Sequence, residues 1–261
     1  MKILAMTVCC VDVYVESNQM CVGGNSINFA AQCLRSGWEH ISVLGAVGRD
    51  AYGDKVMEYL RSSGIEISHV YQLDGPTAYN RIYVKDGEPY FKPDSWQGGI
   101  FEKFLLSESD WAFVKNFDIV AIPANNPNFM EALKRSTGHP RLVVDFMDER
   151  DIEIIKMILP FIDLGFISGN RELADQLKSF SVEINSPIVV TLGAEGSIAL
   201  WKGQSYFHES IPVEKVIDTT GCGDSYQAAF CVSWYCDENL RPAMQAGAEA
   251  ASQVLQRFGG I

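Results

Sequence analysis

Short apolar runs of strand length alternate with helix-period segments along most of the chain, and this alternation restricts the fold more than any other feature. The strand-like runs cover residues 2–8, 41–47, 118–124, 141–146, 164–169 and 187–193. Between them lie segments with the apolar spacing of amphipathic helices, at residues 26–37, 52–64, 107–116 and 171–180. Near-continuous apolar strands separated by helices are typical of a mostly parallel sheet covered on both faces. The sequence therefore predicts a three-layer α/β/α fold.

Length and charge narrow the class of protein further. With 261 residues, of which 47% are hydrophobic, the chain can bury one large core, and we expect residues 1–261 to form a single domain. The net charge of −12 argues against a nucleic-acid or anionic-membrane partner, because both would be repelled. No signal-like segment or membrane-length apolar run is present, and the seven cysteines lack paired spacing, which predicts a cytoplasmic protein with reduced thiols.

Two segments depart from the alternation of strand-like and helix-like segments, and they predict a separate small sheet. Residues 11–17 alternate apolar and polar side chains with period two, as a half-exposed strand does. Residues 77–93 read as a hairpin in which Asp86 and Gly87 suit a two-residue turn. We expect these strands, at about 11–22 and 76–93, to form that small sheet. The alternative is an ordinary hairpin packed on the core.

The segment DTTGCGD, residues 218–224, carries the strongest chemical pattern. It lies between a β-like run at 212–217 and a helical segment at 225–236, so its glycines fall at a strand-to-helix turn. Backbone N–H groups at a helix N-terminus lack intrahelical partners and bind anions, and Gly221 and Gly223 allow close approach. Asp224 would stand beside the anion, where it could take a proton from an attacking hydroxyl. The alternative is that Asp224 only caps the helix.

Residues 218–224 resemble the C-terminal signature of the PfkB (ribokinase-like) carbohydrate kinases. The resemblance implies an ATP- and Mg²⁺-dependent sugar kinase in which Asp224 is the base and the amides of Gly221, Cys222 and Gly223 stabilise the transferred phosphoryl group. In members that bind a monovalent cation such as K⁺, Asp218 and Thr220 would be ligands. Cys222 replaces the usual Ala, and a thiol at a helix N-terminus predicts a lowered pKa and sensitivity to alkylation.

Residues 23–34, GGNSINFAAQCL, place a second pair of glycines before a helix. Amide side chains both donate and accept hydrogen bonds, and a carboxylate accepts several, so both suit a polyol. The resemblance implies that Asp12, Gly24, Asn25 and Asn28, with Asp224, line the sugar pocket. Taken alone, the segment reads equally well as a loop and a helix cap.

On the nucleotide side, residues 190–200 resemble the strand and turn that contact ATP in the family, with Thr191, Gly193 and Gly196 as candidates. A tight hairpin turn is the alternative. Asn170 matches the Asn of the family's N-x-x-E element, which helps to hold phosphate and Mg²⁺. The match is partial, because Leu173 occupies the Glu position and Glu172 lies one residue early.

Scaffold segments resemble the fructoselysine 6-kinases within the family; they are residues 52–70, 106–120, 144–149 and 160–168. This implies phosphorylation of the 6-hydroxyl of a fructosamine, a small-molecule sugar carrying an amino acid. A basic tail would favour acidic or aromatic groups at the pocket mouth, with Glu16, Tyr79, Tyr83 and Asp94 as candidates. The alternatives are a kinase for a plain ketose or other small sugar, and a non-catalytic sugar sensor. The resemblance also implies that the small sheet, with strands at about 11–22 and 76–93, forms a β lid over the sugar. Exposed lid strands often pair in this family, which implies a homodimer as one option.

Overall fold

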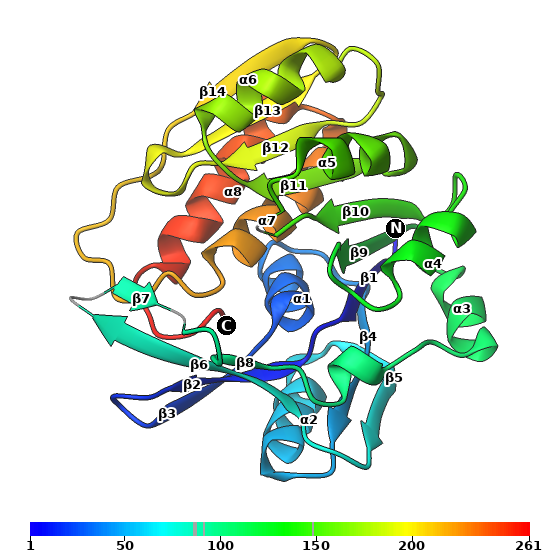
Figure 1. Ribbon diagram of the computed structural model, residues 1–261, viewed down its shortest axis with the longest axis vertical. Helices are drawn as coiled ribbons and strands as arrows, with labels where there is room; N and C mark the ends of the chain where they lie inside the picture. Colours follow the sequence, from blue (N-terminus) through cyan, green and yellow to red (C-terminus); the bar gives the residue numbers. More distant parts are fainter. Residues whose placement is uncertain (86–87, 91, 148) are drawn as a thin grey trace.

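The computed structural model describes residues 1–85, 88–90, 92–147 and 149–261, and a nine-stranded sheet runs through it (Figure 1). The strand order is β14-β13-β12-β11-β10-β9-β1-β4-β5. The strands are β1 (Ile3–Thr7), β4 (Ile41–Gly48), β5 (Glu66–Leu73), β9 (Ile119–Pro123), β10 (Arg141–Asp145), β11 (Leu164–Ser168), β12 (Ile188–Thr191), β13 (Ser197–Trp201) and β14 (Gln204–His208). Neighbours from β5 to β12 pair in parallel, whereas β13 and β14 are antiparallel additions. All six predicted strand-like runs are therefore strands of this sheet.

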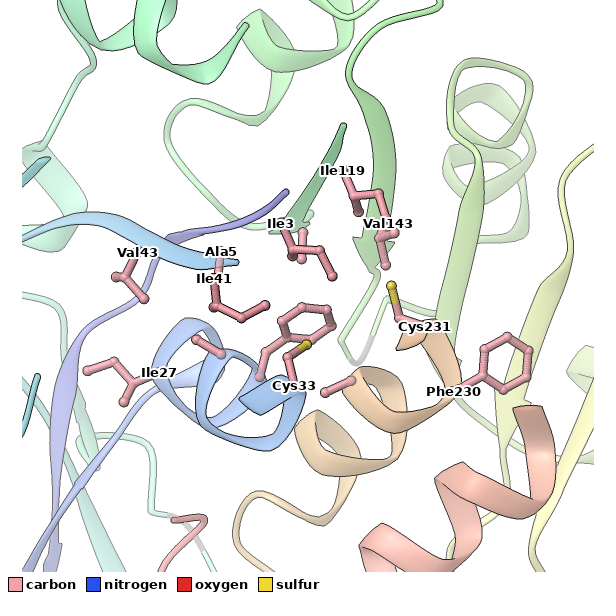
Figure 2. Close-up of a cluster of buried hydrophobic side chains, with 14 of the residues drawn as sticks. Ile3, Ala5, Ile27, Cys33, Ile41, Val43, Ile119, Val143, Phe230 and Cys231 are labelled. Atoms are coloured by element: carbon pink, nitrogen blue, oxygen red, sulfur yellow. The ribbon is translucent and has the colours of Figure 1, made fainter. Parts of the chain in front are cut away.

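Helices cover both faces of the large sheet, because successive strand residues point to opposite sides. Ile3 and Ala5 of β1 belong to one buried cluster, and Leu4 and Met6 to another. The first cluster, part of which Figure 2 shows, is closed by α1 (Asn25–Arg35), α2 (Ala51–Ser63), α7 (Cys222–Asp237) and α8 (Leu240–Val254). The second is closed by α3 (Glu108–Val114), α4 (Phe129–Arg135), α5 (Ile152–Ile158) and α6 (Arg171–Phe180). The three-layer α/β/α prediction is confirmed.

The ends of two helices show why the sequence forms them where it does. Asp50 is the N-cap of α2 and accepts the N–H of Gly53 at 2.8 Å, while Gly64 ends that helix in the left-handed conformation. Ser107 and Asp110 form a capping box at the start of α3. The local sequence therefore fixed these boundaries.

A five-stranded small sheet lies beside the large one and contains β2 (Cys10–Tyr14), β3 (Gln19–Gly23), β6 (Ala78–Lys85), β7 (Glu88–Tyr90) and β8 (Trp96–Gln97). The chain passes from β1 to β2 across two residues, so the two sheets are joined directly at this point. The predicted second sheet is confirmed, with β8 as a strand that the sequence analysis missed. The predicted turn at Asp86 and Gly87 lies outside the described residues.

Residues 212–217, predicted as β-like, do not form a strand. The large sheet ends at the antiparallel edge strand β14, and from there the chain must return across the surface to begin α7. Four of residues 212–217 are exposed, and Pro212 lacks the N–H that a sheet ladder requires. Among the described residues, this β-like run therefore has no neighbouring strand to pair with. Within the described ranges, no helix has the length and apolar character needed to cross a membrane.

Candidate active site

A cavity of about 650 Å³ lies at the carboxyl ends of the large sheet's parallel strands, beneath the small sheet. Ligands bind at this edge of open parallel sheets, where the strand-to-helix turns gather. Nine of the residues singled out from the sequence line it: Asp12, Gly24, Asn25, Asn28, Thr191, Thr220, Gly221, Gly223 and Asp224. The fold thus brings together residues that are about 200 positions apart in the chain.

Asp224 lies in the first turn of α7, where two amide side chains hold its carboxylate. Asn25 donates from Nδ2 to Oδ1 at 2.7 Å, and Asn28 donates from Nδ2 to Oδ2 at 2.8 Å. Both asparagines come from the first turn of α1, which packs against α7. The N-cap of α7 is Gly221 and makes no side-chain cap, so the alternative of Asp224 as an N-cap is wrong. The carboxylate is instead fixed facing the cavity.

A second carboxylate, Asp145, lies next to Asp224 and was missed by the sequence analysis. It is the last residue of β10, and Asn25 Nδ2 also donates to its Oδ2 at 2.9 Å. One amide group therefore bridges both carboxylates. Burial raises the pKa of Asp224, the hydrogen bond from Asn28 lowers it, and the charge of nearby Asp145 raises it. The net effect is a pKa raised to about 7. A carboxylate ending a buried parallel strand was the sequence signal available for Asp145.

The backbone at the start of α7 offers unpaired donors toward the cavity. Gly221 has φ 77°, a left-handed conformation that suits glycine, and nothing lies within 4 Å of a side chain built on Gly223. Within the described residues, the N–H groups of Gly221, Gly223 and Asp224 have no backbone acceptor. Cys222 departs from expectation, because its N–H donates to the Thr219 carbonyl at 3.2 Å. Among the described residues, the N–H groups left without a backbone acceptor at this turn are therefore those of Gly221, Gly223 and Asp224.

The expected low pKa of the Cys222 thiol is wrong. Its Sγ points to α8, where it lies 3.7 Å from the Ala251 carbonyl oxygen, and it does not line the cavity. Burial, followed by the carboxylates of Asp218 and Asp224, raises the pKa of this thiol to about 12. These effects outweigh the helix N-terminus, so the thiol stays protonated.

The carboxylate of Asp218 is buried and accepts four hydrogen bonds. Its Oδ1 accepts from the N–H and hydroxyl of Thr220 at 3.0 and 2.8 Å. Its Oδ2 accepts from the hydroxyl of Tyr14 on β2 and from the N–H of Gly259 at 2.9 Å. Any cation bound by Asp218 would have to displace one of these donors, so the residues as placed do not fit a cation site. Asp218 instead joins the small sheet, the C-terminal segment and the turn before α7.

Asp12 offers the opposite arrangement, a carboxylate that accepts no hydrogen bond from the part of the chain that the structure describes. Its side chain is only 4% exposed and lines the cavity, and no donor within the described residues binds it. Burial, followed by the charges of Asp224 and Asp218, raises its pKa to about 7. Asn28 likewise keeps a buried Oδ1 without a donor in the described part of the chain. Buried acceptors of this kind are suited to ligand hydroxyls.

Of the residues predicted to contact the nucleotide, some line the cavity and others do not. Thr191 at the end of β12 lines the cavity, whereas Gly193, Gly196 and Asn170 do not. Asn170 caps α6 by accepting the N–H of Leu173 at 2.9 Å. The Leu173 side chain is buried in the core, so it offers no ligand where the family has Glu.

The remaining lining residues come mostly from loops and the small sheet. Of those missed by the sequence analysis, the polar ones are Asn80, Lys92, Ser95, Asn125, Ser168 and Gln227. None of the four mouth candidates, Glu16, Tyr79, Tyr83 and Asp94, lines the cavity. Asp94 lies 3.8 Å from Arg81, which already supplies it with a cation.

A family model described as pfkB family carbohydrate kinase matches residues 8–139 and 162–261. The fructoselysine 6-kinases of Shigella flexneri and Escherichia coli strain K12 are each 32% identical over 254 residues, covering 96% of this chain and 95% of theirs. The fructosamine kinase FrlD of Bacillus subtilis is 24% identical over 270 residues, covering 100% of this chain and 93% of its own.

The fold is also shared with solved structures of low sequence identity. Arabidopsis thaliana ribokinase complexed with ribose and ATP superposes with a TM-score of 0.81 at 22% identity, covering 99% of this chain and 93% of that one. Adenosine kinase from Sinorhizobium meliloti gives a TM-score of 0.81 at 18% identity, covering 99% and 95%.

Proposed function

The chain belongs to the pfkB family of carbohydrate kinases and is a sugar kinase, and we propose that it phosphorylates the 6-hydroxyl of a fructosamine with Asp224 as the base. One observation carries the chemical part of this proposal. Asp224 is held by Asn25 and Asn28 at the edge of a cavity and beside unpaired helix N-terminal amides. Phosphorylation of a hydroxyl requires a proton acceptor next to a site that binds the phosphate.

In the proposed reaction, the proton of the substrate hydroxyl passes to the Asp224 carboxylate. The hydroxyl oxygen forms a bond to the γ-phosphorus of ATP, and the bond to the leaving ADP oxygen breaks with its electron pair. The N–H groups of Gly221, Gly223 and Asp224 stabilise negative charge on the transferred group, because they are fixed in place before the reaction. Asp12 and the free Oδ1 of Asn28 accept hydrogen bonds from other sugar hydroxyls.

ATP fits the donor set described above, with Thr191 and Ser168 at the strand ends next to the α7 turn. Within the described ranges, no group of three or more His, Cys, Asp or Glu side chains is arranged to hold a metal ion. Mg²⁺ commonly keeps waters and phosphate oxygens as ligands, so Asp145 alone would suffice as its protein contact, and Asp224 would keep the role of base. When bound, it would supply charge neutralisation at the phosphates.

The fructosamine assignment is supported by the 32% identity to the two fructoselysine 6-kinases over nearly the whole chain. A coupled ADP assay tests it with three substrate groups: fructosamines, free hexoses and nucleosides. We expect the highest kcat/KM with a fructosamine. Preferred use of a free ketose would replace the substrate assignment, and binding without ADP release would contradict the kinase chemistry.

The lid role of the small sheet and a homodimer formed through it remain proposals, as does the cytoplasmic location. The sheet ends in the edge strands β3 and β7, and edge strands offer unpaired backbone groups to a second copy. Sedimentation of the purified protein decides between monomer and dimer.

A further inference from the structure

A second cavity, here called the side groove, adjoins the main one. It has a volume of about 390 Å³ and lies at the carboxyl ends of β9 and β10, next to α4 and α5. Asn125 and Met147 line both cavities and therefore form their common wall. Both volumes lie within the range of small-molecule sites, roughly 300 to 1,000 Å³. A substrate the size of one sugar would leave the side groove empty.

The side groove has mainly apolar walls. Phe129 and Phe146 are buried at its base, while Met130 is 61% exposed and Ile154 is 39% exposed along its rim. A string of methylene groups would cover this surface and remove it from water. The groove therefore favours an extended aliphatic ligand over a second polyol.

Glu149 is the one charged residue among those lining the groove in the described part of the chain. Its Oε1 accepts the N–H groups of Arg150 and Asp151, each at 2.8 Å, which fixes the carboxylate. No lysine or arginine within the described ranges forms an ion pair with it. A fixed carboxylate beside an apolar wall suits a ligand that ends in an ammonium group.

The wall between the two cavities is connected to the proposed base. Met147 has φ 56°, a left-handed conformation that is unusual for a side chain of this size, and its N–H donates to Asp145 Oδ1 at 2.8 Å. Its Sδ lies 4.0 Å from Asn25 Nδ2, the atom that also donates to Asp224. Such residues concentrate at functional sites because the surrounding structure must hold them. The groove is therefore held in a defined position relative to Asp224.

We propose that the side groove binds the amino-acid part of a fructosamine whose sugar lies in the main cavity. Glu149 accepts a hydrogen bond from the terminal ammonium group of that amino acid. This inference rests on the proposed function. When lysine is joined to fructose through its side-chain nitrogen, a run of methylenes separates the sugar from the α-ammonium group. The methylenes pack against Ile154 and Met130. The Asn125 side chain, which has no hydrogen bond within the described residues, lies where the linking nitrogen passes between the cavities.

The test compares two substrates, side-chain-linked fructoselysine and the same compound with its α-amino group acetylated. Glu149→Gln keeps the acceptor for the two backbone N–H groups but removes the charge. We expect it to lower kcat/KM for fructoselysine about tenfold, through KM with kcat unchanged, because a charge-assisted hydrogen bond is lost. The acetylated substrate should behave alike in both proteins. An equal loss with both substrates, or no loss with either, overturns the proposal.

Glu153→Gln is the matched control, since Glu153 is exposed on α5 and lies 3.6 Å from Lys156 rather than in the groove. Ile154→Ala should raise KM for both fructosamines about threefold through lost apolar contact. Met157→Ala, on the same helix and 66% exposed outside the groove, should leave KM unchanged. If Ile154→Ala and Met157→Ala behave alike, the apolar wall takes no part in binding.

Free fructose separates this inference from the proposed function. If the unaltered enzyme phosphorylates fructose but no fructosamine, the substrate assignment itself fails and the groove proposal fails with it. If fructosamines are good substrates and Glu149→Gln changes nothing, the assignment stands and the groove proposal alone is wrong.

Discussion

Two glycine turns begin two helices that pack together, but they use their glycines for different purposes. In the turn before α1, a side chain on Gly23 would lie 2.2 Å from Asp12 Oδ2, and one on Gly24 would lie 2.5 Å from the Val8 carbonyl oxygen. These glycines are needed because the small sheet and its connection to β1 pack directly on them. They allow Asp12 to face the cavity.

The turn before α7 is crowded on one side only. A side chain on Gly221 would lie 2.4 Å from Gly260 Cα, whereas one on Gly223 would meet no atom within 4 Å. Protein packing therefore explains the glycines at 23, 24 and 221, and only Gly223 is left for a ligand to explain. A glycine with open space around it, next to unpaired N–H groups, marks the side from which a phosphate approaches.

The first prediction has the largest expected effect and contrasts Asp224, at the turn before α7, with Asp12, which lies on β2 against Gly23. Asp224→Asn should lower kcat roughly 10²- to 10⁴-fold, because the general base is removed while the hydrogen-bonding shape is kept. Asp12→Asn should act mainly on KM, since Asp12 binds hydroxyls that do not react. Steady-state kinetics on the folded variants measure both. A near-normal kcat in Asp224→Asn would contradict the assignment of the base.

The second prediction contrasts the glycines within the α7 turn. Gly223→Ala should keep its melting temperature but lose about 10²-fold in kcat, because the methyl group displaces the phosphoryl group from the amides. Gly221→Ala should lower the melting temperature, because it combines the Gly260 contact with a left-handed φ that is unfavourable by about 1–2 kcal/mol. Thermal unfolding and kinetics of both variants provide the comparison. Equal stability of the two variants would contradict the packing role of Gly221.

The third prediction is a pH dependence. Asp224 must be ionised to accept a proton, so kcat/KM should rise with pH and level off above about 7, the raised pKa of this carboxyl. Stability should change in the opposite direction. Because the folded-state pKa values of Asp12 and Asp224 are raised to about 7, the folded protein holds protons that the unfolded chain has released.

The melting temperature should therefore fall as pH increases from about 4 to about 7, and Asp224→Asn should reduce that fall. Scanning calorimetry between these pH values measures it, with Asp175→Asn as the control, because Asp175 is exposed on α6 and lies away from the cavity. A melting temperature that rises across the same interval in the unaltered protein, with no change in Asp224→Asn, would show that Asp224 is ionised without penalty.

The smallest effect concerns Cys222. Because its thiol has a raised pKa and faces the Ala251 carbonyl, an alkylating reagent at neutral pH should leave activity unchanged. Cys236, which is exposed, should be labelled first and serves as the internal control. Peptide mapping with parallel activity assays follows both sites. Rapid labelling of Cys222 that ATP prevents would contradict this orientation of the thiol.

The six buried strands and the caps at Asp50 and Ser107 could be predicted because they depend on local patterns, namely apolar periodicity and side-chain bonds to nearby amides. Residues 212–217 could not be predicted correctly, since a β-like run forms a strand only where a partner strand is present. Asp145, Asn80 and Lys92 were missed because they lie on strands or loops whose positions around the cavity depend on strand order.

The amino-acid sequence by itself determined the layer architecture, the two glycine turns and the identity of the proposed base, because each is encoded within a few neighbouring residues. Only the tertiary structure decided which amides remain unpaired, that Asp218 is held by Tyr14 and Gly259, and that Asn25 bridges Asp145 and Asp224. These contacts join segments between 41 and 204 residues apart in the chain. Free N–H groups and shifted pKa values arise only after packing has removed water and placed the partners.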